Sequence, residues 1–271
     1  MPKVKVGDIN MYYEIHGKGE PLVMIMGASG NLEWMENAIP VFSHDYKLVL
    51  FDNRDAGRTD VSNIPYTTET LADDLAGLLD ALQIESAHIQ GASMGGMIAQ
   101  QFVLRYPKRV KSLILACTYC GGPGSSIMTD PEVMRATQRM QSMSGKELMM
   151  ETLGICVSQE FIDNNTGIIQ EMIKLMMKHP ITPQGSIRQG QAVMTHNTYE
   201  RLPEIKAPTL VLSGDADKII PVENSRIIAS RIPGADLVIF KGTGHMFNLE
   251  AEEEVNKIML DFLRRHSTKH P

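Results

Sequence analysis

A serine flanked by glycines stands where a strand-like run of this sequence gives way to a helix-like run. Residues Gly91 to Gly95 read Gly-Ala-Ser-Met-Gly, directly after AHIQ and at the start of MGGMIAQQFVLR. A sharp turn between a strand and a helix exposes the serine hydroxyl, and flanking glycines let the two backbones approach closely. This context predicts that Ser93 is a nucleophile rather than part of a plain glycine turn.

His245 occupies the place where a general base for Ser93 is expected. A serine hydroxyl is a poor nucleophile until a base removes its proton, and a histidine in a loop after a late strand can do this. His245 lies in KGTGHMFNLE, after the strand-like run LVIF and just before a helix that starts near Glu250. The other histidines lie in a strand, near turns, in the polar tail or in the helical segment described below. We therefore predict that His245 is the base.

Two aspartates are candidates for the acid that orients this histidine. A carboxylate must fix the tautomer of the imidazole and stabilise the imidazolium that forms during the reaction. Asp215 and Asp217 both lie in LSGDADKIIP, directly after the strand-like run TLVL. The loop CTYCGGPG, which follows the preceding strand, contains no carboxylate. The choice therefore narrows to these two residues.

Short apolar runs alternate with helix-like segments along most of the chain, and these elements must position the three loops. Runs that are apolar throughout are typical of strands buried on both faces of a mostly parallel sheet. TETLADDLAGLLDALQI has leucines at helical spacing behind a threonine that can cap the helix, and VKVGDINMYYEIHG indicates an opening hairpin. The sequence predicts a doubly wound α/β fold with strands at residues 22–26, 47–51, 87–90, 112–116, 209–214 and 237–240.

The alternation of strands and helices stops after Ala116 and resumes at Pro208. The segment between them begins with the flexible stretch YCGGPGSS and continues with amphipathic runs such as KELMMETLGI and GIIQEMIKLMMKHP. About 80 residues of helix are far too many for an ordinary connection between two strands. We therefore predict an α/β core of residues 1–121 and 206–271, interrupted by a helical cap insertion of residues 122–205.

The composition argues against nucleic acid or a membrane as the partner. The 271 residues include 26 basic and 32 acidic side chains, and a net charge of −6 provides no basic field for phosphates or anionic lipids. No stretch approaches the roughly 20 apolar residues that cross a bilayer, and the first residues lack the apolar core of a secretory signal. We expect a cytoplasmic protein that acts on a small molecule, with its oligomeric state left open.

Cys117 and Cys120 have the C-x-x-C spacing of some zinc sites, but no second Cys or His pair lies near them in sequence. Together with Cys156 they are odd in number and too few for a disulfide framework. We interpret all three as buried thiols. No ligand cluster or nucleotide-binding loop indicates a metal ion or an organic cofactor.

With GASMGG, LSGDADKIIP and GTGHMFNLE in this order, the chain resembles the α/β-hydrolase fold family over nearly all residues outside 122–205. In such proteins the acid typically lies three residues after a glycine and four before a proline. This spacing implies that Asp217 is the acid and that Asp215 caps the loop. The segment FDNRDAGRTD is similar to a family loop with D-x-R and a glycine, and its charges are expected to be structural.

The resemblance also implies which backbone amides stabilise the oxyanion of the transition state. One is the amide of Met94, at the N-terminus of a helix whose dipole favours negative charge. The other is the amide of Ala28, in the loop after LVMIM, with Gly27 lying against the substrate. The family usually has a histidine before this glycine, which helps to fix the loop, and this chain has Met26 instead.

The function implied by the resemblance is hydrolysis of a carboxylic ester. Ser93 would form an acyl-enzyme, and His245 would activate the water that releases the acid. The MGASG loop resembles a branch of esterases and methylesterases, and GASMGGMIAQ resembles enol-lactone hydrolases. A lactonase or a cofactor-free perhydrolase would use the same triad. A ligand-binding receptor of this fold, with little or no catalysis, is an alternative from another class of function. Acyl transfer to an alcohol or thiol is a third alternative.

Methionine is unusually frequent, with nineteen in the chain. Those in the predicted cap are Met128, Met134, Met140, Met143, Met149, Met150, Met172, Met176, Met177 and Met194. Methionine is flexible and polarizable, and it is common on surfaces that adapt to varied apolar partners. We expect most of them to pack cap helices and a few to line an apolar pocket. The alternative is that specificity is set by polar cap residues such as His179, Arg188 or His196.

Overall fold

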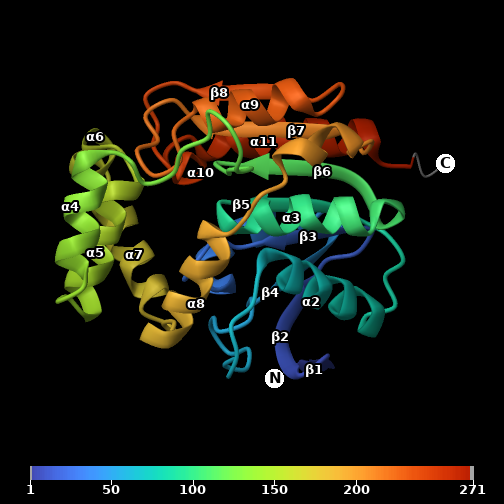
Figure 1. Cartoon of the computed structure of the whole chain (residues 1–271), viewed down its shortest axis with the longest axis horizontal. Coiled ribbons are helices and arrows are strands. Elements are labelled where there is room, and N and C mark those ends of the chain that lie inside the picture. Colours follow the sequence, from blue (N-terminus) through green and yellow to red (C-terminus); the bar gives the residue numbers. More distant parts are fainter. Residues whose placement is uncertain (1, 269–271) are drawn as a thin grey trace.

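The apolar runs form the strands of one eight-stranded sheet in the computed structural model, which describes residues 2–268 (Figure 1). The strands are β1 Lys3–Val6, β2 Ile9–His16, β3 Glu20–Ile25, β4 Tyr46–Phe51, β5 Ala87–Ala92, β6 Val110–Ala116, β7 Thr209–Gly214 and β8 Asp236–Phe240. Their spatial order is β1-β2-β4-β3-β5-β6-β7-β8. The pairs β1–β2 and β2–β4 are antiparallel, and all later pairs are parallel. The predicted hairpin and mostly parallel sheet are confirmed.

The central strands are apolar on both faces because helices cover both faces of the sheet. In β3, Val23 and Ile25 join the core cluster on one side, whereas Leu22 and Met24 join the cluster on the other. Strands β4, β6 and β7 divide their side chains in the same alternating way. Side chains of a strand point to opposite faces in turn, so a strand covered on both sides is apolar throughout.

The helices of the sheet layers are α1 Ala38–Phe42, α2 Thr68–Ala81, α3 Met94–Arg105, α9 Glu223–Arg231, α10 Phe247–Glu250 and α11 Glu252–His266, with short 3-10 helices η1 Leu32–Met35, η2 Pro107–Arg109 and η3 Tyr199–Glu204. Helices α2, α3 and α9 cover one face, with Leu75, Ile98 and Ile228 in its core. Helices α1 and α11 cover the other through Phe42 and Phe262. Within residues 2–268, no helix combines the length and apolar character needed to span a membrane.

Five further helices fill the connection between β6 and β7. They are α4 Pro131–Met140, α5 Gly145–Cys156, α6 Gln159–Asn164, α7 Thr166–Met176 and α8 Pro183–Met194. We call residues 131–194 the helical insertion. Helices α4 to α7 lie together at one side of the molecule, and α8 lies between them and the sheet (Figure 1). The amphipathic runs predicted here form α5 and α7, and α4 and α8 each begin with a capping Asp or Thr followed by proline.

Candidate active site

Ser93 lies in the sharp turn between β5 and α3, where the strand-to-helix context predicts it. Its backbone has φ 56° and ψ −121°, a left-handed region that non-glycine residues rarely occupy. The Ser93 amide donates to the carbonyl of Ala116 (2.9 Å), and the Thr118 hydroxyl donates to the carbonyl of Ser93 (2.7 Å). These two bonds to β6 and the residues after it hold the strained turn in place.

The two glycines of the turn are required by close backbone contacts. A Cβ atom at Gly91 would overlap the carbonyl oxygen of Gly95, and one at Gly95 would overlap the carbonyl oxygen of Ile25. The first turn of α3 therefore packs directly on the ends of β5 and β3. Any larger side chain at either position would push Ser93 away from the loop that follows β3.

His245 and Asp217 are in direct contact. His245 Nδ1 lies 2.7 Å from Asp217 Oδ2, and the other carboxylate oxygen, Oδ1, accepts from the amides of Ile219 and Ile220 (both 2.9 Å). The Asp217 side chain is fully buried, and that of His245 is 11% exposed. With Nδ1 donating to the carboxylate, Nε2 is left as the proton acceptor of the ring.

Asp215, the other candidate acid, points elsewhere. It is exposed, and its Oδ1 accepts from the amide of Gly242 (2.6 Å), which joins the loop after β7 to the loop after β8. This is the loop-capping contact expected of it. Of the two aspartates, only Asp217 contacts His245 among the described hydrogen bonds of residues 2–268.

The loop that carries His245 is tied to the helical insertion by Glu250. Its Oε1 accepts from the amide of Gly244 (2.6 Å), and its Oε2 accepts from the amide (3.0 Å) and hydroxyl (2.5 Å) of Ser158, the residue that caps α6. The Met246 amide also donates to the carbonyl of Cys156 (2.8 Å) at the end of α5. The sequence predicts only a helix that starts near Glu250, and it contains no local signal for this contact.

The loop after β3 lies directly against Ser93. A Cβ atom at Gly27 would be 3.1 Å from Ser93 Cβ and 3.6 Å from Ser93 Oγ, so a side chain at this position would crowd Ser93. Ala28, the next residue, is exposed, and Met94 is buried at the start of α3. The two amides assigned to the oxyanion thus belong to the backbone segments that flank the serine side chain.

Two other segments of the chain hold this loop, in which Met26 stands where the family usually has a histidine. The carbonyl of Met26 accepts from Asn53 Nδ2 (2.9 Å), and the amide of Ser29 donates to Gln189 Oε1 (2.7 Å). Asn53 lies in the loop after β4, and Gln189 lies in α8. The sequence contains no local signal that could have identified Gln189.

The charged side chains of FDNRDAGRTD form ion pairs with other residues of the chain. Arg54 is buried and pairs with Asp74 (2.8 Å) and Asp8 (2.7 Å). Asp55 is paired with Arg188 of α8 (2.8 Å). These contacts are structural, as expected, and the second one joins the helical insertion to the core.

Two of the three polar residues proposed as alternatives for setting specificity make contacts within the protein. Arg188 is held by Asp55, and His196 is buried, with its Nδ1 2.9 Å from the hydroxyl of Thr68. His179 is the exception, because its side chain is 48% exposed and lies 3.9 Å from Glu33.

Burial of His196 makes the stability of the protein depend on pH. Burial lowers the pKa of His196 from 6.5 to about 4, because the charged ring would be desolvated. Between these pH values the unfolded chain binds a proton at His196 that the folded chain does not. The contribution of neutral His196 to the free energy of unfolding is therefore fully present above pH 6.5 and is lost as the pH falls toward 4. We expect a loss on the order of 3 kcal/mol in the free energy of unfolding.

Urea unfolding at pH 7.5 and pH 4.5 measures this loss, with His196→Gln as the test variant. The decline from pH 7.5 to pH 4.5 should be smaller in His196→Gln than in the wild type. His44→Gln, at a histidine with an 85% exposed side chain, should keep the full decline. An equal decline in all three proteins would show that His196 is not responsible.

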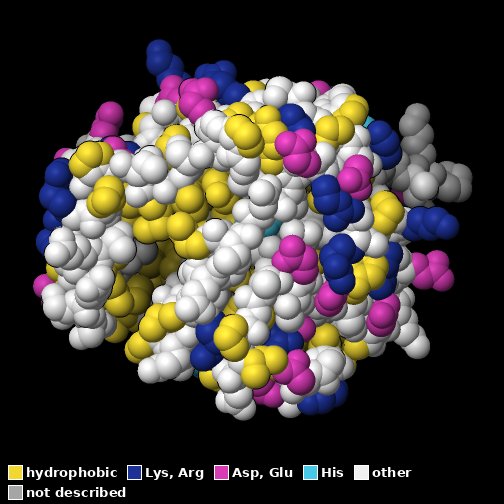
Figure 2. Space-filling view, viewed as in Figure 1, with side chains coloured by type: hydrophobic (Ala, Val, Ile, Leu, Met, Phe, Trp, Pro, Cys, Tyr) yellow, Lys and Arg dark blue, Asp and Glu magenta, His cyan; other side chains and the backbone are white. Residues whose placement is uncertain are grey.

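A hollow lined by hydrophobic side chains separates helices α4 to α7 from the rest of the molecule (Figure 2). Helices α5 and α7, with the residue that follows α5, form an apolar cluster that contains Leu153, Val157, Ile169, Met172, Ile173 and Met176. Trp34 and Met246 pack against this cluster. Since Met246 follows His245 and Trp34 follows the loop after β3, the apolar cluster reaches both loops of the candidate site.

Most methionines of the insertion are not in this cluster. Met172 and Met176 are buried in it, whereas Met134 and Met194 are exposed by 60% and 67%. The expectation that most of these residues pack cap helices therefore holds for only some of them.

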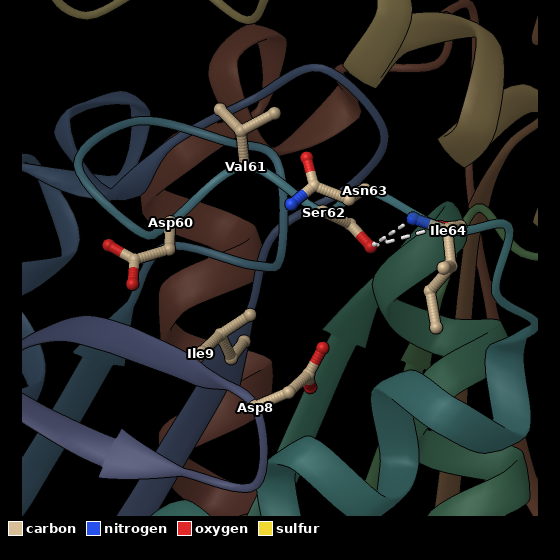
Figure 3. Close-up of a pocket in the computed structure, with 7 residues that line it drawn as sticks. All are labelled: Asp8, Ile9, Asp60, Val61, Ser62, Asn63 and Ile64. Carbon is tan, nitrogen blue, oxygen red and sulfur yellow. Dashed lines mark hydrogen bonds between the residues drawn. The ribbon is translucent and has the colours of Figure 1, made fainter.

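A second hollow, of about 440 Å³, lies beside the start of β2 (Figure 3). It is lined by Asp8 of the β1–β2 turn, by Ile9 at the start of β2 and by residues 60–64 of the loop before α2. Its two carboxylates are both paired, Asp8 with Arg54 and Asp60 with Lys3. None of the residues that line this hollow belongs to the site around Ser93.

Comparison with known proteins supports the same fold. A family model described as alpha/beta hydrolase fold matches residues 20–150, and one described as TAP-like protein matches residues 186–271. The chain is 30% identical to 2-hydroxy-6-oxo-6-phenylhexa-2,4-dienoate hydrolase of Comamonas testosteroni, over 96% of this chain and 93% of that protein.

Two further similarities cover nearly the whole chain. Poly(3-hydroxyalkanoate) depolymerase of Ectopseudomonas oleovorans is 30% identical, over 93% of this chain and 88% of that protein. The solved structure of Est816, an N-acyl homoserine lactone degrading enzyme, is 29% identical with a TM-score of 0.80, over 96% of this chain and 100% of that one. With these full-length similarities and the doubly wound sheet, the chain belongs to the α/β-hydrolase fold family and is a hydrolase.

Proposed function

We propose that this hydrolase cleaves a carboxylic ester through an acyl-enzyme on Ser93. The observation that carries the proposal is the 2.7 Å contact between His245 Nδ1 and the buried Asp217, in a chain whose strained turn presents Ser93. Ser93 Oγ attacks the ester carbonyl and gives its proton to His245 Nε2. His245 then passes the proton to the leaving alcohol, and water attacks the acyl-enzyme by the reverse sequence.

The oxyanion is assigned to the amides of Ala28 and Met94. Preorganised backbone donors of this kind typically contribute several kcal/mol to transition-state stabilisation, because they need no reorganisation when charge develops. The position of Gly27 against Ser93 supports the assignment, since the Ala28 amide is the next one along that loop. The substrate carbonyl would lie over Gly27.

We further propose that residues 122–205 act as a cap over a core of residues 1–121 and 206–271. In a doubly wound sheet, ligands bind at the carboxyl ends of the strands, and β3, β5, β7 and β8 all end in loops of this site. The ties from Gln189 and Ser158 of the insertion to these loops support this arrangement.

A serine-directed phosphonate tests the acyl-enzyme step. The wild type should gain one adduct by intact-mass measurement, located on the peptide with Ser93, and a chromogenic ester should give a burst of alcohol when deacylation is slow. An adduct on another residue, or none, together with full ester hydrolysis would contradict the proposed nucleophile.

We expect a preference for apolar acyl groups. The apolar cluster near Trp34 and Met246 and the engagement of Arg188 by Asp55 both favour an uncharged acyl chain. In a graded series of 4-nitrophenyl esters, each methylene that fits should raise kcat/KM by at most about fivefold, equivalent to about 1 kcal/mol. A strong preference for an ester with a carboxylate near its carbonyl would contradict this and point to His179.

Lactone hydrolysis is the second candidate, favoured by the full-length similarity to the lactone-degrading Est816. An N-acyl homoserine lactone and a 4-nitrophenyl ester of the same acyl length distinguish the two substrates. A lactonase would show the higher kcat/KM on the lactone.

A further inference from the structure

Gln189 is a polar side chain buried between the helical insertion and the loop that lies against Ser93. It is 0% exposed, and both ends of its amide are used. Its Oε1 accepts from the amide of Ser29 (2.7 Å), and its Nε2 donates to the carbonyl of Arg54 (3.0 Å). One side chain of α8 thus joins the loop after β3 to the loop after β4.

The residue that Gln189 holds has a strained backbone. Ser29 has φ 65°, in the left-handed region where a non-glycine residue costs roughly 1–2 kcal/mol. Such a conformation persists only when its surroundings impose it. The bond from the Ser29 amide to Gln189 is one such constraint, and it fixes the peptide plane between Ala28 and Ser29.

The other end of the tie is rigid. Arg54, whose carbonyl accepts from Gln189, has its guanidinium buried in ion pairs with Asp74 and Asp8. The neighbouring Asn53 donates to the carbonyl of Met26 (2.9 Å). The loop of residues 26–29 is therefore held at both ends against the same segment, directly by Asn53 and through Gln189.

We propose that Gln189 is a positioning residue that sets the orientation of the Ala28 amide toward the oxyanion. This inference rests on the proposed function, because it assumes that the Ala28 amide stabilises the transition state. Loss of the tie would let the loop leave its strained conformation, so that the donor is misplaced while the pocket for the substrate remains. The effect should appear in kcat rather than in KM, since the oxyanion forms only in the transition state.

Gln189→Met tests the proposal, because methionine has a similar length and volume but makes neither hydrogen bond. We expect kcat for a 4-nitrophenyl ester to fall about 10- to 100-fold with little change in KM, somewhat less than the loss of an oxyanion donor itself. The affinity for an alkylboronic acid, which forms a tetrahedral adduct with the serine, should weaken by a similar factor. Hydrogen exchange of the peptide containing Ser29 should become faster.

Two variants serve as comparisons. Gln189→Glu keeps an oxygen that accepts from the Ser29 amide but loses the donor to Arg54, so it should recover part of kcat if it folds like the wild type. Gln191→Ala changes a residue of the same type, two positions along α8, whose side chain is exposed. It should behave as the wild type in all three measurements.

The outcomes separate this inference from the proposed function. If Gln189→Met keeps kcat and boronate affinity within about threefold, or changes only KM or thermal stability, Gln189 is a packing residue and the inference is wrong. If Gln189→Met fails to fold, Gln189→Leu, which also makes neither hydrogen bond, decides by the same criteria. If Ser93→Ala itself retains activity, the proposed function fails first.

Discussion

Replacing Ser93 with alanine is expected to abolish ester hydrolysis while leaving the fold intact. The change removes the nucleophilic oxygen, and only the oxyanion donors and substrate binding remain, so kcat should fall by about 10³-fold or more. The fold should survive because the turn is held by backbone atoms. The amide and carbonyl of residue 93 keep their bonds to Ala116 and Thr118.

The measurement is kcat/KM with a 4-nitrophenyl ester, together with the melting temperature and the phosphonate adduct. Ser230→Ala, at an exposed serine of α9, is the matched control and should change none of the three. A Ser93→Ala variant that retains activity within about tenfold of the wild type would overturn the assignment of the nucleophile.

Asp217→Asn should reduce turnover far more than Asp215→Asn. Asp217 Oδ1 accepts from two backbone amides, so an asparagine at this position would keep its oxygen there and turn its NH₂ group toward His245. His245 Nδ1 would then have to accept this hydrogen bond, which leaves the ring proton on Nε2. Nε2 must be unprotonated to take the proton from Ser93. This tautomer cannot take the serine proton, and kcat should fall by about 10⁴-fold.

Asp215→Asn lacks this consequence, because its oxygen can still accept from the Gly242 amide. We expect activity within about threefold of the wild type. Steady-state kinetics across pH 6 to 9 compares the two variants and shows whether the loss in Asp217→Asn is recovered at high pH. Greater damage from the Asp215 change would mean that the acid has been assigned to the wrong residue of this loop.

The strands, the turn at Ser93 and the helical nature of the insertion could be predicted from local sequence. Each of the six predicted strands is present to within two residues at either end, because burial on both faces makes a strand apolar throughout. The turn at residues 91–95 could be predicted for a similar reason. Its glycines are needed for contacts with neighbouring backbone, and that requirement is visible in the residue types alone.

The contacts among the loops depend on the path of the whole chain. Asp215 and Asp217 are of the same type and lie two residues apart; the family spacing implies Asp217, and the contact of Asp217 with His245 is seen only in the folded structure. The ties through Glu250 and Gln189 join residues 92 and 160 positions apart in the sequence. Hydrophobic periodicity and turn chemistry act over a few residues, whereas these hydrogen bonds form only after helices of the insertion pack beside loops of the sheet. The sequence therefore indicated the reacting groups, and the tertiary structure decided what holds them in place.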